Sequence, residues 1–537
     1  MPVSTAPSML PVKNKSTVLL VGFEDQDNLG IRYLASSLRE AGHSAFIVKF
    51  QDDPSPIIES IEQHLPGIVG FSLIFQYYTE RFGMLIRALR TAGVNAHFTI
   101  GGHYASFEPA QLFEFIPELD SIIRFEGEET LVELADRIAC NEDWSDIRGM
   151  ACIDNGSLLI NAARQGRKNL DELPWPVRED IDYSTEDFPT ASMIGGRGCP
   201  WVCSFCSIIT FYEGNGTRGR RLRSPALIVD EVEYLRDRGV RIILWQDDDF
   251  LAGGKAGVRW AHAVAEECIR RGLNKDLRWK ISCRSDEVKA ESLAPLVEAG
   301  LTHVYLGVEA GDPESLRHLN KVLQPESHFL AAEVLKQLNL SFDFGFMLME
   351  PWSTFDTIRN NLKFLEEFAG DGYAPAGYCR MLPYVGTGVE KKLLAEDRLE
   401  KKDCYADYHF LDPRLDRFYE WQLGAFKHRN HGPNGTLNLL RLLNFESHLD
   451  FAERPFSSSF CNKVQAVTSL SNHFMLATLS EALAHFEESG LSNKTVSDEY
   501  LLALSSEHNR QDEHLRNDIL RILAKMPVSY KRKFVVM

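Results

Sequence analysis

The chain has 537 residues, of which 44% are hydrophobic and 25% are charged, so it is long enough for three or four ordinary globular domains. Its 58 basic and 76 acidic side chains leave a net charge of -18, which argues against a nucleic-acid partner. No apolar run reaches the roughly 18 residues of a membrane helix and the first residues lack the apolar core of a signal peptide, so we expect a cytoplasmic protein with no membrane partner.

Short apolar runs alternate with helical patterns between residues 16 and 140. Five of the runs predict strands, and they read "TVLLVGF", "AFIVKF", "GIVGFSL", "HFTIGG" and "SIIRFEG". Strands separated by helices are typical of an open, parallel, doubly wound sheet, whose ligands bind at the carboxyl ends of the strands. We therefore predict a Rossmann-like domain over residues 1–165, ending in a hairpin that turns at Asn155 and Gly156.

A stretch with Pro174, Pro176 and Pro189 and no helical period predicts a linker over residues 166–190. Six further apolar runs follow, all but the last with a helical stretch behind them: "ASMIGGRG", "VRIILWQDDDF", "LRWKISCRSD", "LTHVYLGVEAG", "LSFDFGFMLMEP" and "AGYCRMLPYVG". Such a series predicts a parallel barrel, or part of one, over residues 191–395. Its active site is expected at the C-terminal ends of the strands, where the suggestive polar residues fall.

Beyond about residue 395 the strand pattern ends. The remaining apolar runs have helical spacing, so residues 396–537 are expected to form a mostly helical domain. We expect this domain to cover the barrel mouth and shape a substrate pocket, because one end of the barrel must be closed to exclude water from an active site there. The predicted fold class is α/β, with a doubly wound N-terminal domain, a partial (β/α)6 barrel and a helical C-terminal domain.

Three of the ten cysteines lie in the stretch "GRGCPWVCSFCSI", at Cys199, Cys203 and Cys206. The others are scattered, which fits a reducing compartment and not a disulfide framework. A structural zinc ion usually has four protein ligands, so a zinc site here would need a remote fourth residue. Three thiolates on a 4Fe-4S cluster leave one iron open for a substrate or cofactor, and we predict this cluster.

The spacing of the cysteines, with the aromatic Phe205 directly before the third, resembles the signature of the radical S-adenosylmethionine (SAM) superfamily. The resemblance covers roughly residues 190–390 as the partial barrel. It implies that the open iron chelates SAM, and that one electron cleaves SAM to a 5'-deoxyadenosyl radical. It also implies an external electron donor of the flavodoxin or ferredoxin type.

The same resemblance implies SAM-binding residues at three strand ends. Asp247, Asp248 and Asp249 close the second barrel strand, where the family commonly contacts the SAM amino group, although a solvated turn has the same composition. Arg284 ends the third strand and is expected to pair with the SAM carboxylate or to cap a neighbouring helix. Glu309 follows a largely apolar strand, where a lone carboxylate needs a partner. The predicted SAM contacts are Phe205, Asp247, Asp249, Arg284 and Glu309.

A doubly wound domain in front of a radical SAM barrel resembles the cobalamin-dependent subclass of these enzymes. Their cobalamin-binding loop commonly reads D-x-H-x-x-G, and this chain has "DQDNLG", with Asp25, Asp27 and Gly30 at the matching positions. Asp27 stands where the histidine would be. The departure implies that no histidine from this loop ligates the cobalt of a bound cobalamin.

Two further strand ends match the places where the cobalamin-binding family holds the nucleotide tail. Ser72 follows the third strand, and Gly101 and Gly102 follow the fourth, where glycine would allow close backbone approach to a bulky ligand. Taken singly, each residue is equally typical of an ordinary strand end or turn. Their position at successive strand ends of one sheet favours cobalamin binding.

A cysteine that faces the inside of the barrel could donate a hydrogen atom in radical chemistry. Cys283 and Cys379 fall on predicted barrel strands and are the candidates, although a small core residue is the usual role of a buried thiol. His103 follows Gly102 and could contact a cofactor, but a loop residue without such a contact is the commoner case.

The resemblance implies an enzyme with a 4Fe-4S cluster, SAM and cobalamin as cofactors. We predict a methyltransferase that acts on an unactivated carbon of a small-molecule metabolite through a 5'-deoxyadenosyl radical and methylcobalamin. A cyclisation or rearrangement without methyl transfer is the alternative within the same family. RNA methylthiolation is disfavoured because it needs a second cluster and residues 1–139 contain no cysteine. A cobalamin-binding sensor or carrier with a structural cluster is the alternative outside enzymes.

Overall fold

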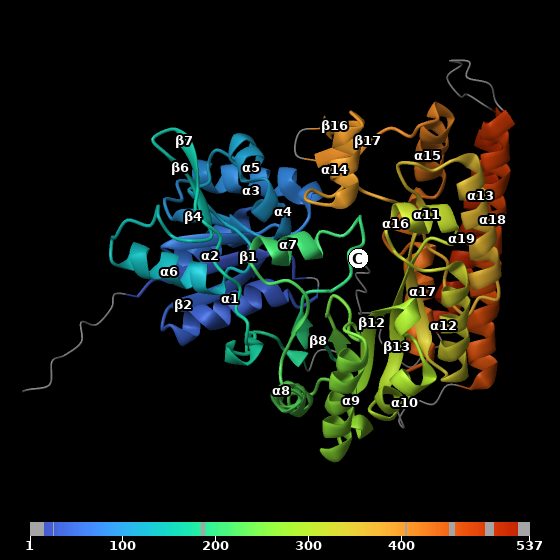
Figure 1. The fold of residues 1–537 in the computed structure, drawn as a ribbon, viewed down its shortest axis with the longest axis horizontal. Coiled ribbons are helices and arrows are strands. Elements are labelled where there is room, and N and C mark those ends of the chain that lie inside the picture. Colours follow the sequence, from blue (N-terminus) through green and yellow to red (C-terminus); the bar gives the residue numbers. More distant parts are fainter. Residues whose placement is uncertain are drawn as a thin grey trace, which may run out of the picture. The chain divides into compact units, whose positions relative to one another are not determined.

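The computed structural model describes residues 15–24, 26–183, 188–402, 405–449, 457–488 and 499–524 (Figure 1). They form two compact units. The first contains the chain up to residue 181 together with residues 210–217 and 402–405, and the second contains residues 182–209, 218–401 and the chain from 406 onward. The predicted helical domain of residues 396–537 therefore belongs, apart from 402–405, to the same unit as the barrel.

A seven-stranded sheet forms the first unit. Its order is β2-β1-β3-β4-β5-β6-β7, with β1 to β5 parallel and the hairpin β6–β7 antiparallel at the edge. The strands are β1 (Thr17–Gly22), β2 (Ser44–Lys49), β3 (Ile68–Ser72), β4 (His97–Gly101), β5 (Ser121–Ile123), β6 (Met150–Asp154) and β7 (Ser157–Ile160). The predicted doubly wound sheet is confirmed, and Asn155 and Gly156 make the hairpin turn with φ of 48° and 75°.

Helices connect the parallel strands of the first unit. They are α1 (Leu29–Glu40), α2 (Ser55–His64), α3 (Thr79–Thr91), α4 (His103–Phe107), α5 (Pro109–Phe115) and α6 (Glu128–Ala139). The buried residues of α1 have the spacing of one helical face. On this face, Ile31, Ala35 and Leu38 belong to the same apolar core as residues 131 and 134 of α6. This core fixes the start of α1, and with it the loop that follows β1.

The second unit contains six parallel strands in the order β15-β14-β13-β12-β11-β8. The predicted partial barrel is confirmed. Its strands are β8 (Thr190–Met193), β11 (Ile242–Trp245), β12 (Arg278–Arg284), β13 (Leu301–Glu309), β14 (Ser341–Met349) and β15 (Cys379–Arg380). The connecting helices are α8 (Pro225–Asp237), α9 (Lys255–Arg270), α10 (Ala290–Glu298), α11 (Pro313–His318), α12 (Pro325–Gln337) and α13 (Phe355–Ala369).

Alternate residues of the barrel strands face opposite sides of the sheet. On β14, Phe344 and Phe346 pack against the aromatic residues of α13, so they lie on the outer face. Asp343 lies between Phe342 and Phe344 and therefore faces inward, and so does Tyr305, its partner in register on β13. This register identifies the inner face of the half-barrel on every strand.

The C-terminal part of the chain is mainly helical, as predicted, with α14 (Gly388–Ala395), α15 (Pro413–Ala425), α16 (Lys427–His431), α17 (Thr436–Ser447), α18 (Ser458–Glu488) and α19 (Glu499–Leu523). The expectation that strands end near residue 395 is wrong, because β16 (Leu399–Lys402) and β17 (Tyr405–Tyr408) form a two-stranded sheet. Among the described residues, no helix is both long and apolar enough to cross a membrane.

Helix α17 closes one end of the half-barrel. Phe445 and the following Leu449 form an apolar cluster with Ile242 and Leu244, which lie at the start of β11. Asn444 donates from Nδ2 to the carbonyl oxygen of Phe342, near the start of β14, over 3.3 Å. The end closed by α17 is thus the one where the strands begin, opposite to the mouth that we expected the helical region to cover.

Candidate active site

The cysteine loop lies at the mouth of the half-barrel, after the short strand β9 (Gly196–Arg197), which pairs antiparallel with β10 (Arg221–Leu222). Cys199, Cys203 and Cys206 are free thiols and half-buried, and Phe205 between them is half-buried as well. The amide of Cys206 donates to the carbonyl oxygen of Cys203 over 3.2 Å, which closes a turn between two of the predicted ligands. The loop is therefore an ordered segment with its three thiols accessible.

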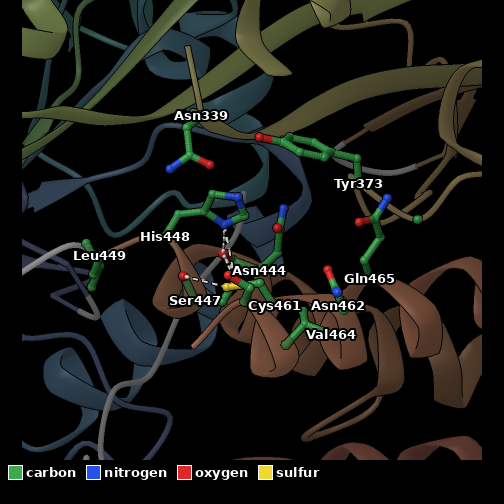
Figure 2. A pocket seen from close by; sticks show the side chains of 12 residues that line it. Asn339, Tyr373, Asn444, Ser447, His448, Leu449, Cys461, Asn462, Val464 and Gln465 are labelled. Carbon is green, nitrogen blue, oxygen red and sulfur yellow. Dashed lines mark hydrogen bonds between the residues drawn. The ribbon is translucent and has the colours of Figure 1, made fainter. Parts of the chain in front are cut away.

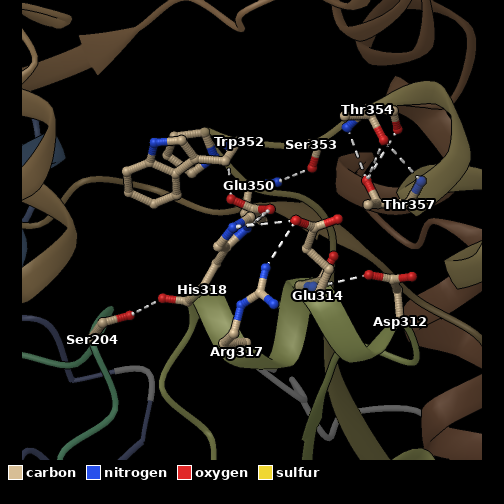
Figure 3. Close-up of polar contacts among 12 residues, drawn as sticks. Ser204, Asp312, Glu314, Arg317, His318, Glu350, Trp352, Ser353, Thr354 and Thr357 are labelled. Carbon is tan, nitrogen blue, oxygen red and sulfur yellow. Dashed lines mark hydrogen bonds and ion pairs between the residues drawn. The ribbon is translucent and has the colours of Figure 1, made fainter.

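Ser204 is the point at which the rest of the unit holds the cysteine loop. Its amide donates to the carbonyl oxygen of Leu319 over 2.9 Å, and its hydroxyl donates to that of His318 over 2.8 Å (Figure 3). Its own carbonyl oxygen accepts from the amide of Val389 over 2.9 Å. Three hydrogen bonds from two distant segments thus fix the residue between Cys203 and Phe205.

A buried hydrogen bond in turn holds His318. Its Nδ1 lies 2.8 Å from Oε1 of Glu350, a residue directly after β14 that is 1% exposed (Figure 3). The other carboxyl oxygen of Glu350 accepts from the amide of Trp352 over 2.8 Å, and the amide of Glu350 donates to Ser353. Sequence reasoning did not identify this pair. In the sequence, the pair is indicated solely by the carboxyl group of Glu350, which follows the apolar run "FMLM".

The three acids after β11 lie beside the cysteine loop, as the chain order predicts. Asp247 accepts from the amide of Gly195 over 2.8 Å and pairs with Arg220 over 3.0 Å, while Asp248 accepts from the amide of Gly198 over 2.9 Å. Burial raises the pKa of Asp248 to about 6. Two of the three carboxyl groups therefore already serve to attach the loop to the strand.

The third acid, Asp249, forms a close carboxyl pair with Glu287. Burial raises the pKa of both groups, and the neighbouring Asp249 contributes to raising that of Glu287 to about 9. Asp249 also accepts from the amide of Leu251 over 3.2 Å. The pair holds a proton at neutral pH because two buried carboxylates so close together repel each other.

Arg284 lies against the cysteine loop. Its guanidinium is 4.1 Å from the ring centre of Trp201, and its Nη1 is 3.9 Å from the Sγ of Cys203. Further contacts are with Asp286 over 3.0 Å and with the carbonyl oxygen of Lys321 over 2.9 Å. Of the two roles expected for Arg284, this position next to a predicted cluster ligand favours a role at the cofactors.

Glu309 has the partner that its burial requires. It ends β13 with φ of 70°, and its Oε1 is 3.1 Å from the Nζ of Lys321, which is 4% exposed. Lys321 was not identified from the sequence, because it lies twelve residues further on in a segment without a motif. Burial raises the pKa of the Cys203 thiol, whereas Lys321 and Arg284 lower it. The two cations therefore favour the thiolate form of Cys203.

These residues fit a 4Fe-4S cluster by the chemistry of the donor set, which consists of three soft thiolate ligands on one loop with cations beside one of them. In the part of the chain that the structure describes, no three side chains of histidine, cysteine, aspartate or glutamate are arranged around a single metal ion.

Of the predicted cobalamin residues, Asp25 lies outside the described residues. Asp27 pairs with Arg178, a residue 1% exposed, over 2.7 Å. Asn28 caps α1 by accepting from the amide of Ile31 over 3.3 Å, and Gly30 lies exposed in the first turn. The carboxylate at the histidine position of the family motif therefore has an arginine partner in the first unit.

Ser72 and Gly101 are partners in register at the adjacent ends of β3 and β4. Gly102 follows with φ of 119°, and a Cβ there would overlap the carbonyl oxygen of Leu73. The close approach that requires glycine is thus to a neighbouring strand end, whereas we expected approach to a ligand. The predicted residues are brought together at one edge of the sheet, next to the loop after β1.

Residues 210–217 belong to the first unit although they follow the cysteine loop. Phe211, in α7 (Ile208–Gly214), stacks on His103 with ring centres 4.1 Å apart, and Asn215 donates from Nδ2 to Glu126 over 2.9 Å. Burial lowers the pKa of His103 to about 4, so its ring is neutral. This covering of the loops after β4 and β5 was not predicted, because no motif marks it.

The two barrel cysteines differ in position. Cys283 is buried and is the partner in register of Leu306, on the outer face, which agrees with the small core residue expected of a buried thiol and not with the alternative of an inward-facing hydrogen-atom donor. Cys379 is exposed, and burial of its surroundings raises its pKa to about 12. It pairs in register with Met347 on the inner face.

A pocket of about 410 Å³ lies between the ends of α17 and α18 and the residues that precede β14 and β15 (Figure 2). His448, Asn444, Cys461 and Tyr373 are among the residues that line it. His448 hydrogen-bonds through Nδ1 to the carbonyl oxygen of Asn444 over 2.9 Å. Because the pocket adjoins the beginnings of the strands, it is at the opposite end of the half-barrel from the cysteine loop.

Two family models match the chain. The model described as "B12 binding domain" matches residues 16–135, and the model described as "Radical SAM superfamily" matches residues 193–364. The first range covers the parallel strands of the first unit. The second covers the cysteine loop and most of the half-barrel.

The curated relatives of this chain are named for different activities. An uncharacterized methyltransferase of Pyrococcus horikoshii is 26% identical over 407 residues, which are 74% of this chain and 84% of the relative. An anaerobic magnesium-protoporphyrin IX monomethyl ester cyclase of Cereibacter sphaeroides is 28% identical over 71% of this chain and 62% of the relative. A hopanoid C-3 methylase of Methylococcus capsulatus is 28% identical over 62% of this chain and 63% of the relative.

Among solved structures, the cobalamin-dependent SAM radical enzyme OxsB, with aqua-cobalamin and SAM bound, is similar in fold with a TM-score of 0.69. The match covers 95% of this chain and 81% of OxsB at 17% identity. Fold, cysteine loop and both family models define an enzyme of the radical SAM type. The chain belongs to the cobalamin-dependent radical SAM enzymes, whose cofactors are cobalamin, SAM and a 4Fe-4S cluster.

Proposed function

We propose that the chain is a methyltransferase that places a methyl group on an unactivated carbon of a small-molecule metabolite. The observation that carries the proposal is the convergence of the cysteine loop, Arg284 and the Glu309–Lys321 pair at the mouth of a half-barrel, in a chain with a B12-binding domain. Two relatives named as a methyltransferase and a methylase support the methyl transfer. The net charge of -18 supports a small-molecule substrate over a nucleic acid.

Each site residue has a role that follows from its contacts. Cys199, Cys203 and Cys206 hold the cluster, while Arg284 and Glu309 bind the charged ends of SAM. Lys321 holds Glu309 in position and favours the Cys203 thiolate. When bound, SAM with the cluster supplies a 5'-deoxyadenosyl radical, and cobalamin supplies the methyl group. The electron comes from an external donor of the flavodoxin or ferredoxin type.

In the first unit, Ser72, Gly101 and Gly102 form the edge against which cobalamin binds. The pairing of Asp27 with Arg178 leaves the loop after β1 without a free ligand for cobalt at this position. The Asp27 carboxylate, held by Arg178, would therefore serve the loop and not the cobalt of a bound cobalamin. This arrangement distinguishes the chain from cobalamin domains that use the histidine of the D-x-H-x-x-G motif.

A second candidate keeps both cofactors but transfers no methyl group. The similarity to the Cereibacter cyclase favours it, since that relative matches over nearly the same share of this chain as the Pyrococcus methyltransferase. A cyclase or rearrangement enzyme would use the same cysteine loop and the same SAM-binding residues. The two candidates differ in the products made from SAM.

The test is an anaerobic assay of protein purified from cobalamin-fed cells, with SAM, a strong reductant and an extract of small metabolites. 5'-Deoxyadenosine and S-adenosylhomocysteine are quantified together by mass spectrometry. Comparable amounts of both support methyl transfer, whereas deoxyadenosine alone contradicts it and favours the second candidate. Cys203→Ala is expected to abolish both products, and Cys140→Ala, at an exposed cysteine of the first unit, is the matched control that keeps them.

A further inference from the structure

The inner face of the half-barrel carries a layer of charged side chains that the cofactors do not use. Lys280 on β12 is the partner in register of His303 on β13, and Asp343 on β14 lies one inward position further along. Arg441 of α17 completes the layer, with its Nε 3.7 Å from Oδ1 of Asp343. His303 Nε2 lies 3.9 Å from the other oxygen of Asp343. Four titratable groups from four elements thus meet inside the barrel.

The layer has more positive than negative charge. Burial holds the pKa of His303 well below its ordinary value, so its ring is neutral, and Lys280 and Arg441 face the single carboxylate of Asp343. In the described parts of the chain, no carboxylate lies within ion-pair distance of Lys280, whose Nζ is 5.8 Å from the ring centre of Tyr305. Lys280 is half-buried and burial lowers its pKa, so its positive charge is held there at a cost that a bound anion would offset.

The inner face above this layer is partly accessible. On β13 the outward-facing Val304, Leu306 and Val308 are 0% exposed, whereas the inward-facing Tyr305 and Gly307 remain partly accessible. Gly345 lies at the matching position of the neighbouring strand, and a Cβ there would lie only 2.7 Å from the hydroxyl of Tyr305. Glycine at this position therefore makes room for the inward-facing Tyr305 side chain, which lies between the charged layer and Glu309.

The layer has an apolar floor and an open side toward the cysteine loop. Below it, the cluster of Ile242, Leu244, Phe445 and Leu449 closes the barrel. Above it, Arg284 lies four residues beyond Lys280 on the same strand, which corresponds to roughly 13 Å at about 3.3 Å per residue. A molecule that reached from the cofactors to the charged layer would extend over that distance.

We propose that Lys280 and Arg441 bind an anionic group of the substrate, a carboxylate or a phosphate, inside the half-barrel. The inference rests on the proposed function in that the bound molecule is the substrate of the radical reaction. The anion neutralises the excess positive charge, Tyr305 lines its path, and the reacting carbon lies toward Arg284 and Glu309. Helix α17 thereby contributes a substrate-binding residue from the C-terminal part of the chain.

The test measures anion binding to the cofactor-loaded protein by isothermal titration calorimetry, with inorganic phosphate and succinate as probes at constant ionic strength. Lys280→Met is expected to weaken binding of the preferred probe about tenfold or more. Methionine is of similar length to lysine but has no ionisable group, so the charged contact to the anion is lost. Lys289→Met, at an exposed lysine, is the matched control and is expected to bind as the wild type does. Phosphate preference assigns a phosphate ester, and succinate preference assigns a carboxylate.

Equal affinity of Lys280→Met and the wild type, or no saturable binding of either probe, would overturn the proposal. Thermal unfolding without anions separates a structural role from a binding role. Loss of an unpartnered charge is expected to leave the stability of Lys280→Met unchanged or higher, whereas a drop would identify Lys280 as a structural partner of Asp343. Substrate-free cleavage of SAM by the wild type and by Lys289→Met, measured under the same conditions, tests the proposed function separately.

Discussion

Replacing His318 tests whether the buried hydrogen bond to Glu350 fixes the cysteine loop. His318→Ala removes the donor that lies 2.8 Å from Oε1 of Glu350, a side chain that is 1% exposed. Leaving a buried acceptor without a partner costs about 1–3 kcal/mol. A loss of this size changes the equilibrium between ordered and disordered forms about 5- to 160-fold, because each 1.4 kcal/mol is about a factor of ten. Because the carbonyl oxygen of His318 accepts from Ser204, we expect the loss to reach the cysteine loop.

The assay reconstitutes the cluster anaerobically and measures iron per chain, visible absorption and the electron paramagnetic resonance signal of the reduced cluster. His318→Ala is expected to hold less iron and to show a shifted or broadened signal. His318→Asn, which keeps an N–H donor near the position of Nδ1, is expected to restore both. Arg317→Ala is the matched control, because Arg317 is 71% exposed and pairs with Glu314 three residues earlier, on the surface of the same helix. Equal iron content and identical spectra in His318→Ala and Arg317→Ala would refute the reasoning.

Three further substitutions test other parts of the structure. Gly102→Ala is expected to lower the thermal stability of the first unit and its cobalamin content, because a Cβ there would overlap the carbonyl oxygen of Leu73. Gly156→Ala is the control: a Cβ at Gly156 would meet no atom within 4 Å, so this variant should lose only about 1 kcal/mol of stability. Glu287 has a folded pKa of about 9, above its ordinary value, so the stability from its proton is full below about pH 4.5 and lost toward pH 9; denaturant titrations of Glu287→Gln should show a flatter pH dependence in that window. Arg178→Met should destabilise the first unit by about 1–3 kcal/mol, because it leaves the Asp27 carboxylate without this partner, while the exposed Arg39→Met should change little. Unchanged unfolding of Arg178→Met would contradict a structural role of that pair.

The doubly wound sheet and the partial parallel barrel could be predicted because the apolar runs are short and alternate with helical patterns. The cysteine loop could be predicted because its ligands lie within eight residues of one another, so that spacing in the sequence determines spacing in the fold. Arg284 and Glu309 followed from their places at strand ends. In a parallel sheet all such ends share one edge.

Partners that meet only through the fold were not predictable. Lys321 pairs with Glu309 from a loop without a motif, and Arg220 reaches Asp247 from another segment. Lys280 and Arg441 are 161 residues apart in the numbering, and their proximity depends on how α17 packs into the open half-barrel. The same holds for Gly102, whose requirement for glycine comes from the neighbouring Leu73. These contacts depend on long-range packing that local patterns do not encode.

The first unit receives its last pieces late in the chain. Residues 210–217 supply Phe211 and Asn215, and Lys402–Tyr405 adds Tyr405, whose ring centre lies 5.4 Å from that of Tyr77. During synthesis, all seven strands of the sheet are therefore translated long before the segments that cover it. The six strands of the half-barrel are translated between residue 181 and Tyr405. A fragment that ends at residue 181 would keep every strand of that sheet but would lack the cover over His103 and Glu126. The B12-binding unit thus obtains its last contacts only after nearly the whole radical SAM region has been translated.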